Sequence, residues 1–225
     1  MPPSSRNHSM TERLPTDAAY DGLRRRIIRG EYLPSQRLVE AHVADDLKVG
    51  RYAVRQALAR LQAEGLVTLE PNRGATVAAV SLQDAIDTLE AREYLEGAAA
   101  ALAAERIAPA ALESLTTRLA ELRTALADQA FDRYSETNRR FHAIVYEASG
   151  NRSLPQLIDV LKARVARLHL RTVLIPGRSE RSLAEHEAIH AAIAAHDAPA
   201  AEAAARAHIR GLRQTVEQAW DLVRF

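Results

Sequence analysis

The chain of 225 residues contains no cysteine, which excludes disulfide bonds and metal sites built on thiolates. Aromatic residues make up only 4% of it and alanine is abundant, a composition that favours closely packed helices over a sheet-rich fold. No apolar run approaches the ~20 residues that span a bilayer, and no signal-peptide core follows Met1. We therefore expect a soluble cytoplasmic protein with no membrane partner.

An excess of one charge sign is also lacking, because the formal net charge is only +1. The charge is unevenly distributed, however. Residues 1–80 hold 12 Arg or Lys against 9 Asp or Glu, a net +3, whereas residues 81–225 hold 18 against 20, a net −2. A basic front on a slightly acidic body is compatible with nucleic-acid binding at one end of the chain.

The first 80 residues divide into a tail and a small folded unit. Residues 1–12 are polar, rich in Pro and Ser and without apolar periodicity, so we expect a disordered tail. Three helices are predicted next, and the first opens at Pro15 with Thr16 as its N-cap. Two β-like runs follow, joined by residues 71–74 (PNRG), a loop with the Pro and Gly typical of a hairpin. Three helices and a hairpin over residues 13–80 predict a winged helix-turn-helix.

The third predicted helix has two distinct faces. Apolar residues recur at i, i+3, i+4 and i+7, the spacing of one buried stripe, at Val54, Ala57, Leu58 and Leu61. The opposite face carries Arg51, Tyr52, Arg55, Gln56 and Ala59. A short basic helix can enter the major groove of DNA, which is about 12 Å wide, and its arginines can bind base edges or phosphates. Alternatively, the arginines only keep a solvated helix soluble.

Residues 81–225 show helical periodicity throughout. A capping-box-like start at Ser81 to Asp84 opens the first helix. Breaks at Pro and Gly then predict about six helices, over residues 82–107, 109–128, 131–149, 154–173, 180–196 and 199–223. No strand pattern and no fixed repeat appear, which indicates an antiparallel helical bundle. The expected fold class is mainly α, a winged helix-turn-helix followed by an all-α bundle of about six helices.

Several polar residues interrupt the apolar stripes of the predicted bundle. Asn138 and His142 lie four apart on one helix face, and His186 and His208 fall on two later helices. Neutral imidazole suits Zn, Ni or Mn, so three histidines from three helices could close on a divalent cation. His190, one turn beyond His186, is a weaker candidate for the same cavity. The alternative for each histidine is an ordinary buried or surface position.

Residues 37–77, RLVEAHVADDLKVGRYAVRQALARLQAEGLVTLEPNRGATV, resemble the GntR family of bacterial transcription regulators, and the match extends from about residue 14 to 80. The resemblance implies a winged helix-turn-helix domain that binds double-stranded DNA. Position by position, the DNA contacts of the family fall on Arg37, Arg51, Tyr52, Ala53, Arg55, Arg73 and Gly74.

Three positions depart from the pattern of that family. Gln36 stands where glycine is common, and Gly50 stands where a serine usually caps the recognition helix. Tyr52-Ala53 replaces a small hydroxyl residue followed by proline. Glycine is an adequate N-cap but lacks a hydroxyl that could reach a phosphate. These departures leave the expected fold intact and the operator sequence undefined.

Residues 81–218 resemble the FCD domain, the effector-binding bundle of FadR-type GntR regulators. There an Asp-x-x-x-His pair and two later histidines hold a metal, and the matching positions are Asn138, His142, His186 and His208. The neutral amide of Asn138 removes a negative charge and lowers the expected metal affinity. Arg92 aligns with an arginine that the family places over its effector, where a guanidinium grips a carboxylate. Otherwise Arg92 is a surface residue paired with Glu93 or Glu96.

The two resemblances imply a ligand-responsive transcription regulator. It is expected to be a homodimeric repressor that binds a short inverted-repeat operator and is released by a small organic acid bound at the metal site. The stronger rival keeps DNA binding but treats the bundle as a dimerisation module with no metal and no effector. A metal-dependent enzyme with Glu185 or Glu187 as base is a distant alternative, which explains nothing about the first 80 residues. We expect no enzyme, because no obvious nucleophile accompanies a base.

Overall fold

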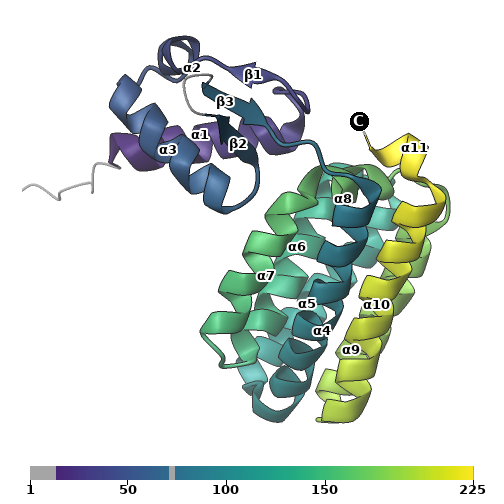
Figure 1. Cartoon of the computed structure of the whole chain (residues 1–225). Helices are drawn as coiled ribbons and strands as arrows, with labels where there is room; N and C mark the ends of the chain where they lie inside the picture. Colours follow the sequence, from purple (N-terminus) through teal and green to yellow (C-terminus); the bar gives the residue numbers. More distant parts are fainter. Residues whose placement is uncertain (1–13, 71–73, 225) are drawn as a thin grey trace, which may run out of the picture. The chain divides into compact units, whose positions relative to one another are not determined.

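The computed structural model describes residues 14–70 and 74–224, and the chain divides into two compact units, Met1–Ala79 and Val80–Phe225 (Figure 1). The unit boundary lies one residue before the expected division after residue 80. The tail expected at residues 1–12 lies outside the described residues.

The first unit packs three helices against a small antiparallel sheet. The helices are α1 (Pro15–Arg29), α2 (Glu40–Leu47) and α3 (Arg51–Ala63). The strands β1 (Arg37–Leu38), β2 (Val67–Glu70) and β3 (Gly74–Val77) lie in the order β1-β3-β2, with Thr68 opposite Thr76. The winged helix-turn-helix prediction is confirmed. Strand β1 was not predicted, because two residues are too few to show an alternating pattern.

The core of this unit lies between the helices and the sheet. Leu23 and Ile27 of α1 are fully buried, as are Val54 and Leu61 of α3. The hydroxyl of Tyr20 donates a hydrogen bond to Glu64, which ties α1 to the residue after α3. The buried stripe predicted for the third helix is therefore present and fixes which face of α3 points outward.

Local corrections concern the ends of two helices and one loop. Leu14, not Thr16, is the N-cap of α1, because Pro15 already occupies the first helical position. At the loop position where the family commonly has glycine, the Gln36 side chain accepts a hydrogen bond from the Leu33 amide, and the preceding Ser35 adopts the left-handed conformation with φ 63°. Lys48 ends α2 in the left-handed region, with φ 54°.

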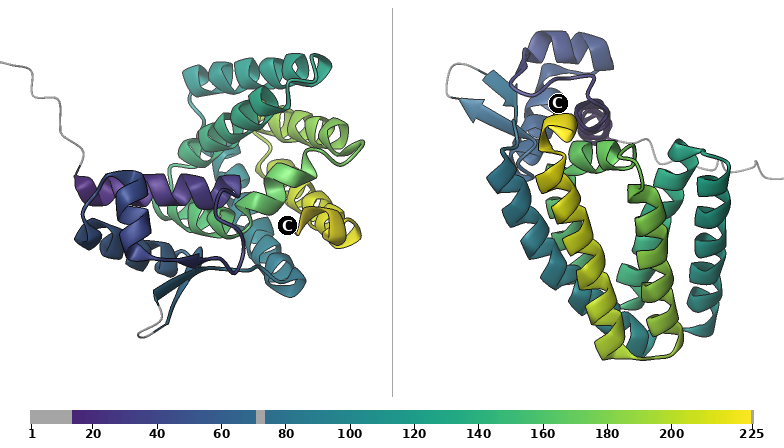
Figure 2. Two further views of the ribbon diagram at one scale, coloured as in Figure 1. Left: turned by 90° about the horizontal axis from the view of Figure 1, so that it is seen from above. Right: turned by 90° about the vertical axis from the view of Figure 1, so that its right-hand side faces the viewer.

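The second unit is an antiparallel bundle of α-helices (Figures 1 and 2). Its elements are α4 (Leu82–Arg106), α5 (Pro109–Ala127), α6 (Phe131–Ala148), α7 (Ser153–Arg164), α8 (Ala166–Thr172), α9 (Arg178–Ala194), α10 (Ala198–Gln218) and α11 (Trp220–Val223). Within the described part of the chain, no helix is long and apolar enough to cross a membrane.

Two of the six predicted helices are interrupted. The stretch predicted as residues 154–173 breaks at Val165, where φ −107° and ψ 12° leave the helical region and separate α7 from α8. Residues 199–223 break in the same way at Ala219, with φ −112° and ψ 23°. Neither break contains Pro or Gly, so the sequence gives no local signal for it.

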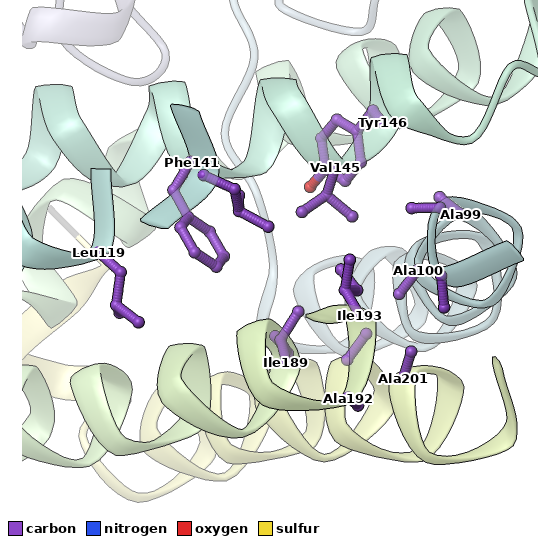
Figure 3. Packing of buried hydrophobic residues seen from close by; sticks show 14 of the residues in the cluster. Ala99, Ala100, Leu119, Phe141, Val145, Tyr146, Ile189, Ala192, Ile193 and Ala201 are labelled. Carbon is purple, nitrogen blue, oxygen red and sulfur yellow. The ribbon is translucent and has the colours of Figure 1, made fainter. Parts of the chain in front are cut away.

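Small residues bring α4 and α10 close together along the bundle, where they lie side by side (Figure 1). A Cβ atom on Gly97 of α4 would stand 2.7 Å from Cγ of Arg206 of α10. Farther inside, Phe141 and Val145 of α6 face Ile189 and Ile193 of α9 (Figure 3). A second apolar cluster includes Leu89, Ile209, Leu212 and Val216. His208 thus follows the part of α10 that enters the first cluster and precedes the part that enters the second.

Candidate DNA-binding face and candidate metal centre

The outward face of α3 carries the side chains expected to reach DNA. Arg51, Tyr52 and Arg55 are exposed, and Tyr52 is 71% accessible. Nε of Arg55 lies 3.0 Å from Oε2 of Glu40 at the start of α2. Arg37 is exposed on β1, opposite Thr76. These side chains form a partly basic surface across the helix-turn-helix.

Three of the expected DNA contacts, Ala53, Arg73 and Gly74, are not part of the exposed face of α3. Ala53 is only 4% exposed and belongs to the buried stripe of α3, so its methyl group faces the core and a DNA contact at this position would have to come from the backbone. Arg73 lies outside the described residues. Gly74 opens β3 with φ 85°, a conformation that favours glycine and explains why the wing carries one there.

Gly50 is the N-cap of α3, and no side chain caps this end of the helix. The first backbone N–H groups of a helix attract anions through their unsatisfied hydrogens and the helix dipole. The N-terminus of α3, which follows the turn after α2, therefore presents donors without an intervening side chain.

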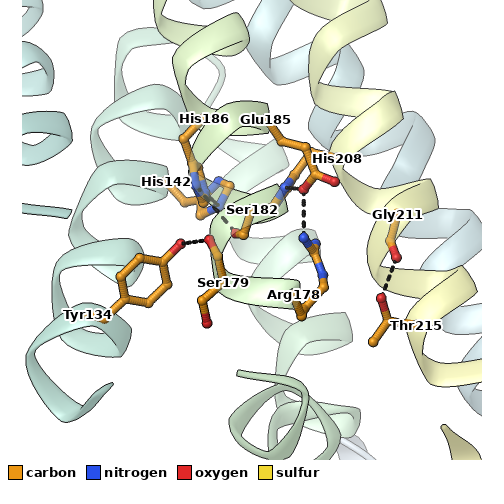
Figure 4. Close-up of polar contacts among 10 residues, drawn as sticks. All are labelled: Tyr134, His142, Arg178, Ser179, Ser182, Glu185, His186, His208, Gly211 and Thr215. Atoms are coloured by element: carbon orange, nitrogen blue, oxygen red, sulfur yellow. Dashed lines mark hydrogen bonds and ion pairs between the residues drawn. The ribbon is translucent and has the colours of Figure 1, made fainter. Parts of the chain in front are cut away.

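Three helices of the second unit bring His142, His186 and His208 together (Figure 4). Each offers one ring nitrogen, and these nitrogens all lie within 4.8 Å of one another. Nε2 of His142 and Nε2 of His186 are 3.0 Å apart. Two nitrogens that share an ion at about 2.0–2.1 Å stand roughly 3–3.4 Å apart, so this pair already has a suitable separation. The three histidines are buried, and His186 is fully so.

A carboxylate orients one of these rings from behind. Nδ1 of His208 lies 2.7 Å from Oε2 of Glu185, and Nη1 of Arg178 donates to the same oxygen at 3.0 Å (Figure 4). This contact leaves Nε2 of His208 for a metal, and an outer carboxylate behind a metal-binding histidine raises its basicity. On His186, Nδ1 faces the Ser182 hydroxyl at 3.5 Å, and Nε2 is directed toward His142.

The protonation state of His142 also suits a metal ligand. Burial holds the pKa of His142 well below its usual value, and the neighbouring His186, His208, Lys162 and Arg92 lower that pKa further. The imidazole is therefore neutral at physiological pH, which is the form that binds metals. Asn138 is buried one turn before His142 on α6 and borders a small hollow with Tyr134, Arg178 and Ser182.

A group of buried charges adjoins the histidines. Nε of Arg92 donates to Oε1 of Glu96 at 2.8 Å, and the Tyr146 hydroxyl donates to Oε2 of Glu96 at 2.6 Å. The Tyr146 ring stacks on His142 with centroids 5.9 Å apart, and Nζ of Lys162 lies 5.2 Å from the Tyr146 centroid. Arg92 does pair with Glu96, but it is buried, not a surface residue.

The electrostatics of this group follow from burial and pairing. For Glu96, burial opposes ionisation, but Arg92, Lys162 and the hydrogen bonds outweigh it and lower the pKa of the carboxyl. Burial and the adjacent Glu96 carboxylate raise the pKa of Tyr146 well above its usual value. Tyr146 is therefore a neutral donor to an ionised Glu96.

Some site residues could not be identified from the sequence. Arg178, Lys162 and Tyr146 enter the site through the folding of α6, α7 and α9, and no motif marks them. Glu96 stands one turn after Arg92, a spacing that does predict an ion pair. Conversely, His190 is not part of the cluster, because its Nε2 contacts the Thr116 hydroxyl on α5 at 2.8 Å.

An exposed, arginine-bearing recognition helix in one unit and a buried polar centre in an all-helical second unit define a class of protein, the DNA-binding regulators with a sensory domain. Comparison with known proteins agrees. Residues 15–77 match the family described as "Bacterial regulatory proteins, gntR family", and residues 87–211 match the FCD domain. The chain belongs to the GntR family of transcriptional regulators, in its FadR subfamily.

Relatives and solved structures extend over nearly the whole chain. The HTH-type transcriptional repressor RspR of Escherichia coli is 28% identical over 199 residues, which cover 88% of this chain and 87% of RspR. LutR of Bacillus subtilis, an HTH-type transcriptional regulator, is 30% identical over 212 residues, or 84% and 95% of the two chains. The structure of E. coli McbR/YncC superposes with a TM-score of 0.78 at 22% sequence identity. The superposition covers 92% of this chain and 98% of McbR/YncC. The protein is a DNA-binding transcriptional regulator and not an enzyme.

Proposed function

We propose that this chain is a homodimeric, cytoplasmic repressor whose helical domain binds a divalent metal ion together with a small organic acid. His142, His186 and His208 would hold Zn, Ni or Mn, with Asn138 beside them. Binding of the acid would act through the linker at residues 78–82. It would change the relative placement of the two winged domains of the dimer, and the operator would be released. The observation that carries the proposal is the meeting of three buried histidines from three helices, one of them oriented by Glu185.

The ligand set supports a metal in several respects. Nε2 of His142 and Nε2 of His186 are separated by a distance that suits a shared ion, and the site is buried. Glu185 supplies the outer carboxylate that often accompanies a metal-binding histidine. When bound, the ion would supply a Lewis-acidic centre for the carboxylate of an acid.

Arg92 supports an anionic effector. It is a buried cation close enough to His142 to lower the pKa of that ring, and guanidinium binds carboxylates in bidentate fashion. In the structure its Nε already contacts Glu96, so an incoming acid would bind next to a charged pair. The relatives add a repressor named for the galactonate operon, 27% identical over 211 residues.

The DNA half of the proposal rests on the exposed face of α3. A two-fold dimer presents two recognition helices to two half-sites, so we expect a short inverted repeat. Arg51 and Arg55 are one turn apart and exposed, and a bidentate contact from arginine to guanine gives ~1–3 kcal/mol of discrimination. Light scattering should report a dimer, and a monomer at micromolar concentration would contradict this part.

Metal content and ligand-dependent melting test the sensory half. The purified chain, dialysed against Zn²⁺ and then against metal-free buffer, should retain one ion per chain, and His186→Ala should retain none. The melting temperature should rise with at least one member of a panel of small hydroxy and dicarboxylic acids. A chain that retains no metal and melts at the same temperature with every acid would leave the bundle as a dimerisation module.

Gel-shift assays with the upstream region of the gene itself test the DNA half. The double variant Arg51→Ala with Arg55→Ala should lose specific retention, while its circular dichroism stays that of the parent chain. Gln62→Ala, an exposed change near the end of α3, is the matched control and should bind normally. Normal binding by the double variant would show that the recognition surface is elsewhere.

A further inference from the structure

The two arginines on the exposed face of α3 are not equivalent. Nε of Arg55 donates a hydrogen bond to Oε2 of Glu40 at 3.0 Å, whereas no carboxylate pairs with Arg51 in the part of the chain that the structure describes. The side chain of Arg55 is nevertheless 66% exposed, and that of Glu40 is 33% exposed. A carboxylate therefore lies within the surface proposed to bind DNA, beside one of its two recognition arginines.

The other ion pairs of the first unit have a different place. Arg24, Arg26 and Arg60 each take part in a pair that joins α1 to another helix or to the residue at its end. The pair of Arg55 with Glu40 instead joins the start of α2 to the outward face of α3. An exposed pair contributes little to stability. A brace between two helices that already share an apolar core therefore does not account for a carboxylate on this face.

The atoms in contact leave Arg55 able to read a base. Glu40 is the first residue of α2, where the unsatisfied N–H groups and the helix dipole favour a carboxylate. Glu40 binds Nε of Arg55, which carries only one of the five N–H donors of a guanidinium. Both terminal nitrogens remain for a bidentate contact with O6 and N7 of guanine. The carboxylate also restricts the rotamers of Arg55 before DNA arrives, which reduces the entropic cost of that contact.

The charge of this pair affects specific and non-specific binding differently. Non-specific affinity comes from cations that displace counterions from the phosphates. The Glu40 carboxylate cancels the charge of Arg55 and repels phosphates, so Arg55 adds little to the binding of arbitrary DNA. Hydrogen bonds from its terminal nitrogens to a guanine edge are kept. A repulsive group beside an attractive one is a common source of specificity.

We infer that Glu40 is a positioning residue that directs Arg55 to a guanine in each half-site of the operator and withholds it from phosphates. The inference rests on the proposed recognition surface of α3 and deepens it, because it names the base and the residue that selects it. Arg51, with no paired carboxylate, binds the DNA backbone instead. It is the first residue of α3, directly after Gly50, where the helix N-terminus also favours a phosphate.

Two substitutions at position 40 separate the charge of the carboxylate from its contact with Arg55. Glu40→Gln removes the charge and keeps the length of the side chain. Glu40→Asp keeps the charge, but its side chain is shorter by one methylene and withdraws from Nε of Arg55. Asp46→Asn is the matched control, because it removes a carboxylate from the same helix that pairs with Arg26 of α1 and not with α3.

The experiment compares two DNA probes, the duplex that the full parent chain selects from a random library and a scrambled duplex of the same composition. Fluorescence anisotropy at several salt concentrations gives both affinities, and their quotient is the specificity ratio. Glu40→Gln should bind the scrambled duplex about threefold more tightly, with a salt slope steeper by about one, and its specificity ratio should fall about tenfold. Glu40→Asp should lose the ratio similarly but bind the scrambled duplex as the parent does. Asp46→Asn should keep the parent ratio.

Exchange of single bases in the selected duplex locates the contact of Arg55. Replacement of one guanine in each half-site should weaken binding of the parent chain about tenfold. Arg55→Ala should not respond to that replacement, and Glu40→Gln should respond less than the parent. A role of Glu40 in stability alone would leave this base preference unchanged.

The outcomes separate this inference from the proposed recognition surface. If both variants at position 40 keep the parent ratio while Arg55→Ala loses it, the role of Glu40 is wrong and the surface stands. If Arg55→Ala weakens binding to both duplexes equally, Arg55 is a phosphate contact and the inference is also wrong. If Arg51→Ala and Arg55→Ala each bind both duplexes as the parent does, the surface itself is wrong. If Glu40→Gln is misfolded by circular dichroism, the specificity ratio of Glu40→Asp decides.

Discussion

Gly211 permits the contact that orients His208. It lies three residues after His208 on α10, and a Cβ atom there would stand 2.5 Å from Oε1 of Glu185. Because that oxygen ends a flexible side chain, the carboxylate would move instead of the backbone. Glu185 would then lose its position behind His208.

We therefore predict that Gly211→Ala weakens Zn²⁺ binding about 10–100-fold, the usual effect of removing an outer ligand. Its effect on the free energy of unfolding should stay below about 1 kcal/mol, because alanine favours the helix by a similar amount. Zinc competition and urea unfolding, followed by the fluorescence of Trp220, measure the two quantities. Trp220 is the single tryptophan and packs in the second unit.

Gly97→Ala is the control for this prediction. Its Cβ would crowd Cγ of Arg206 at 2.7 Å and not Glu185, so zinc affinity should stay within about twofold of the parent value. If both alanine variants weaken zinc binding equally, the role given to Gly211 is wrong.

At the scale of residues, sequence reasoning identified the histidines but not their surroundings. Positions 142, 186 and 208 were chosen because they interrupt apolar stripes and match the metal-binding histidines that the resemblance to the FCD domain implies, and the structure brings them together. For Ala53, alignment to a family gives a position but not its burial, so the sequence did not show that its side chain faces the core. Arg178 and Lys162 depend on how α7 and α9 pack, which no local pattern encodes. Arg92 was correctly paired with Glu96 as an alternative, but its burial was not foreseen.

Lys48 occupies a strained position at the end of α2. Its φ of 54° lies in the left-handed region, which costs a side-chain-bearing residue about 1 kcal/mol. Lys48→Gly should therefore stabilise the first unit by roughly 0.5–1 kcal/mol, visible as slower hydrogen exchange of α2 and α3 amides in the full chain. Lys48→Ala loses the same charge but keeps the backbone strain. Equal hydrogen-exchange protection of the α2 and α3 amides in both variants would therefore contradict the prediction.

Ser81 and Asp84 form a capping box at the start of α4. The Ser81 hydroxyl accepts from the Asp84 amide at 3.1 Å, and the Ser81 amide donates to Oδ2 of Asp84 at 3.2 Å. Hydrogen bonds from the Ser81 side chain and then its backbone lower the pKa of Asp84. The stability from the ionised carboxylate is thus present above the unfolded pKa, near 4, and is lost as pH falls through the lower folded value.

Ser81→Ala should reduce the free energy of unfolding of the second unit by about 0.5–2 kcal/mol at pH 7. The deficit should shrink as the pH falls below about 4, because the parent chain then loses the ionised carboxylate as well. Urea titrations at several pH values, read by Trp220 fluorescence, measure it. Ser114→Ala, an exposed serine inside α5, should show no such pH dependence. A deficit that stays constant to pH 3 would exclude the role of Asp84.

At the scale of elements, prolines and glycines predicted most boundaries. Pro109 opens α5 as expected, and the capping box at Ser81 opens α4. The breaks at Val165 and Ala219 and the short strand β1 were missed, because they arise from tertiary packing and pairing. Asn151 was also missed as the residue whose side-chain oxygen accepts from the first amides of α7.

For the whole molecule, the proposed control of DNA binding implies a reciprocity. If an acid weakens operator binding by some factor, the operator must weaken acid binding by that factor, typically 5–150-fold. Calorimetry of the zinc-loaded chain with and without operator DNA, compared with operator titrations with and without acid, measures both. The Arg51→Ala and Arg55→Ala double variant should bind the acid equally well whether DNA is present or absent. If the two measured factors differ, acid binding and operator binding are not linked through a single conformational equilibrium.

At this scale the two-unit organisation was predictable, because charge, periodicity and strand signals all change near residue 80. How one unit responds to the other was not, since it depends on small differences in packing free energy and not on any motif.

The contact between Arg92 and Glu96 has a consequence for sensitivity. Glu96 is a carboxylate tethered one helical turn from the guanidinium, and Tyr146 holds it in place. Any acid that binds Arg92 must compete with the Glu96 carboxylate, whose local concentration at the guanidinium is high. If an acid acts there as proposed, this competition would set a threshold concentration of acid below which the regulator stays unchanged. Substitution of Tyr146, which leaves the arginine itself intact, would then tune the concentration at which the gene responds.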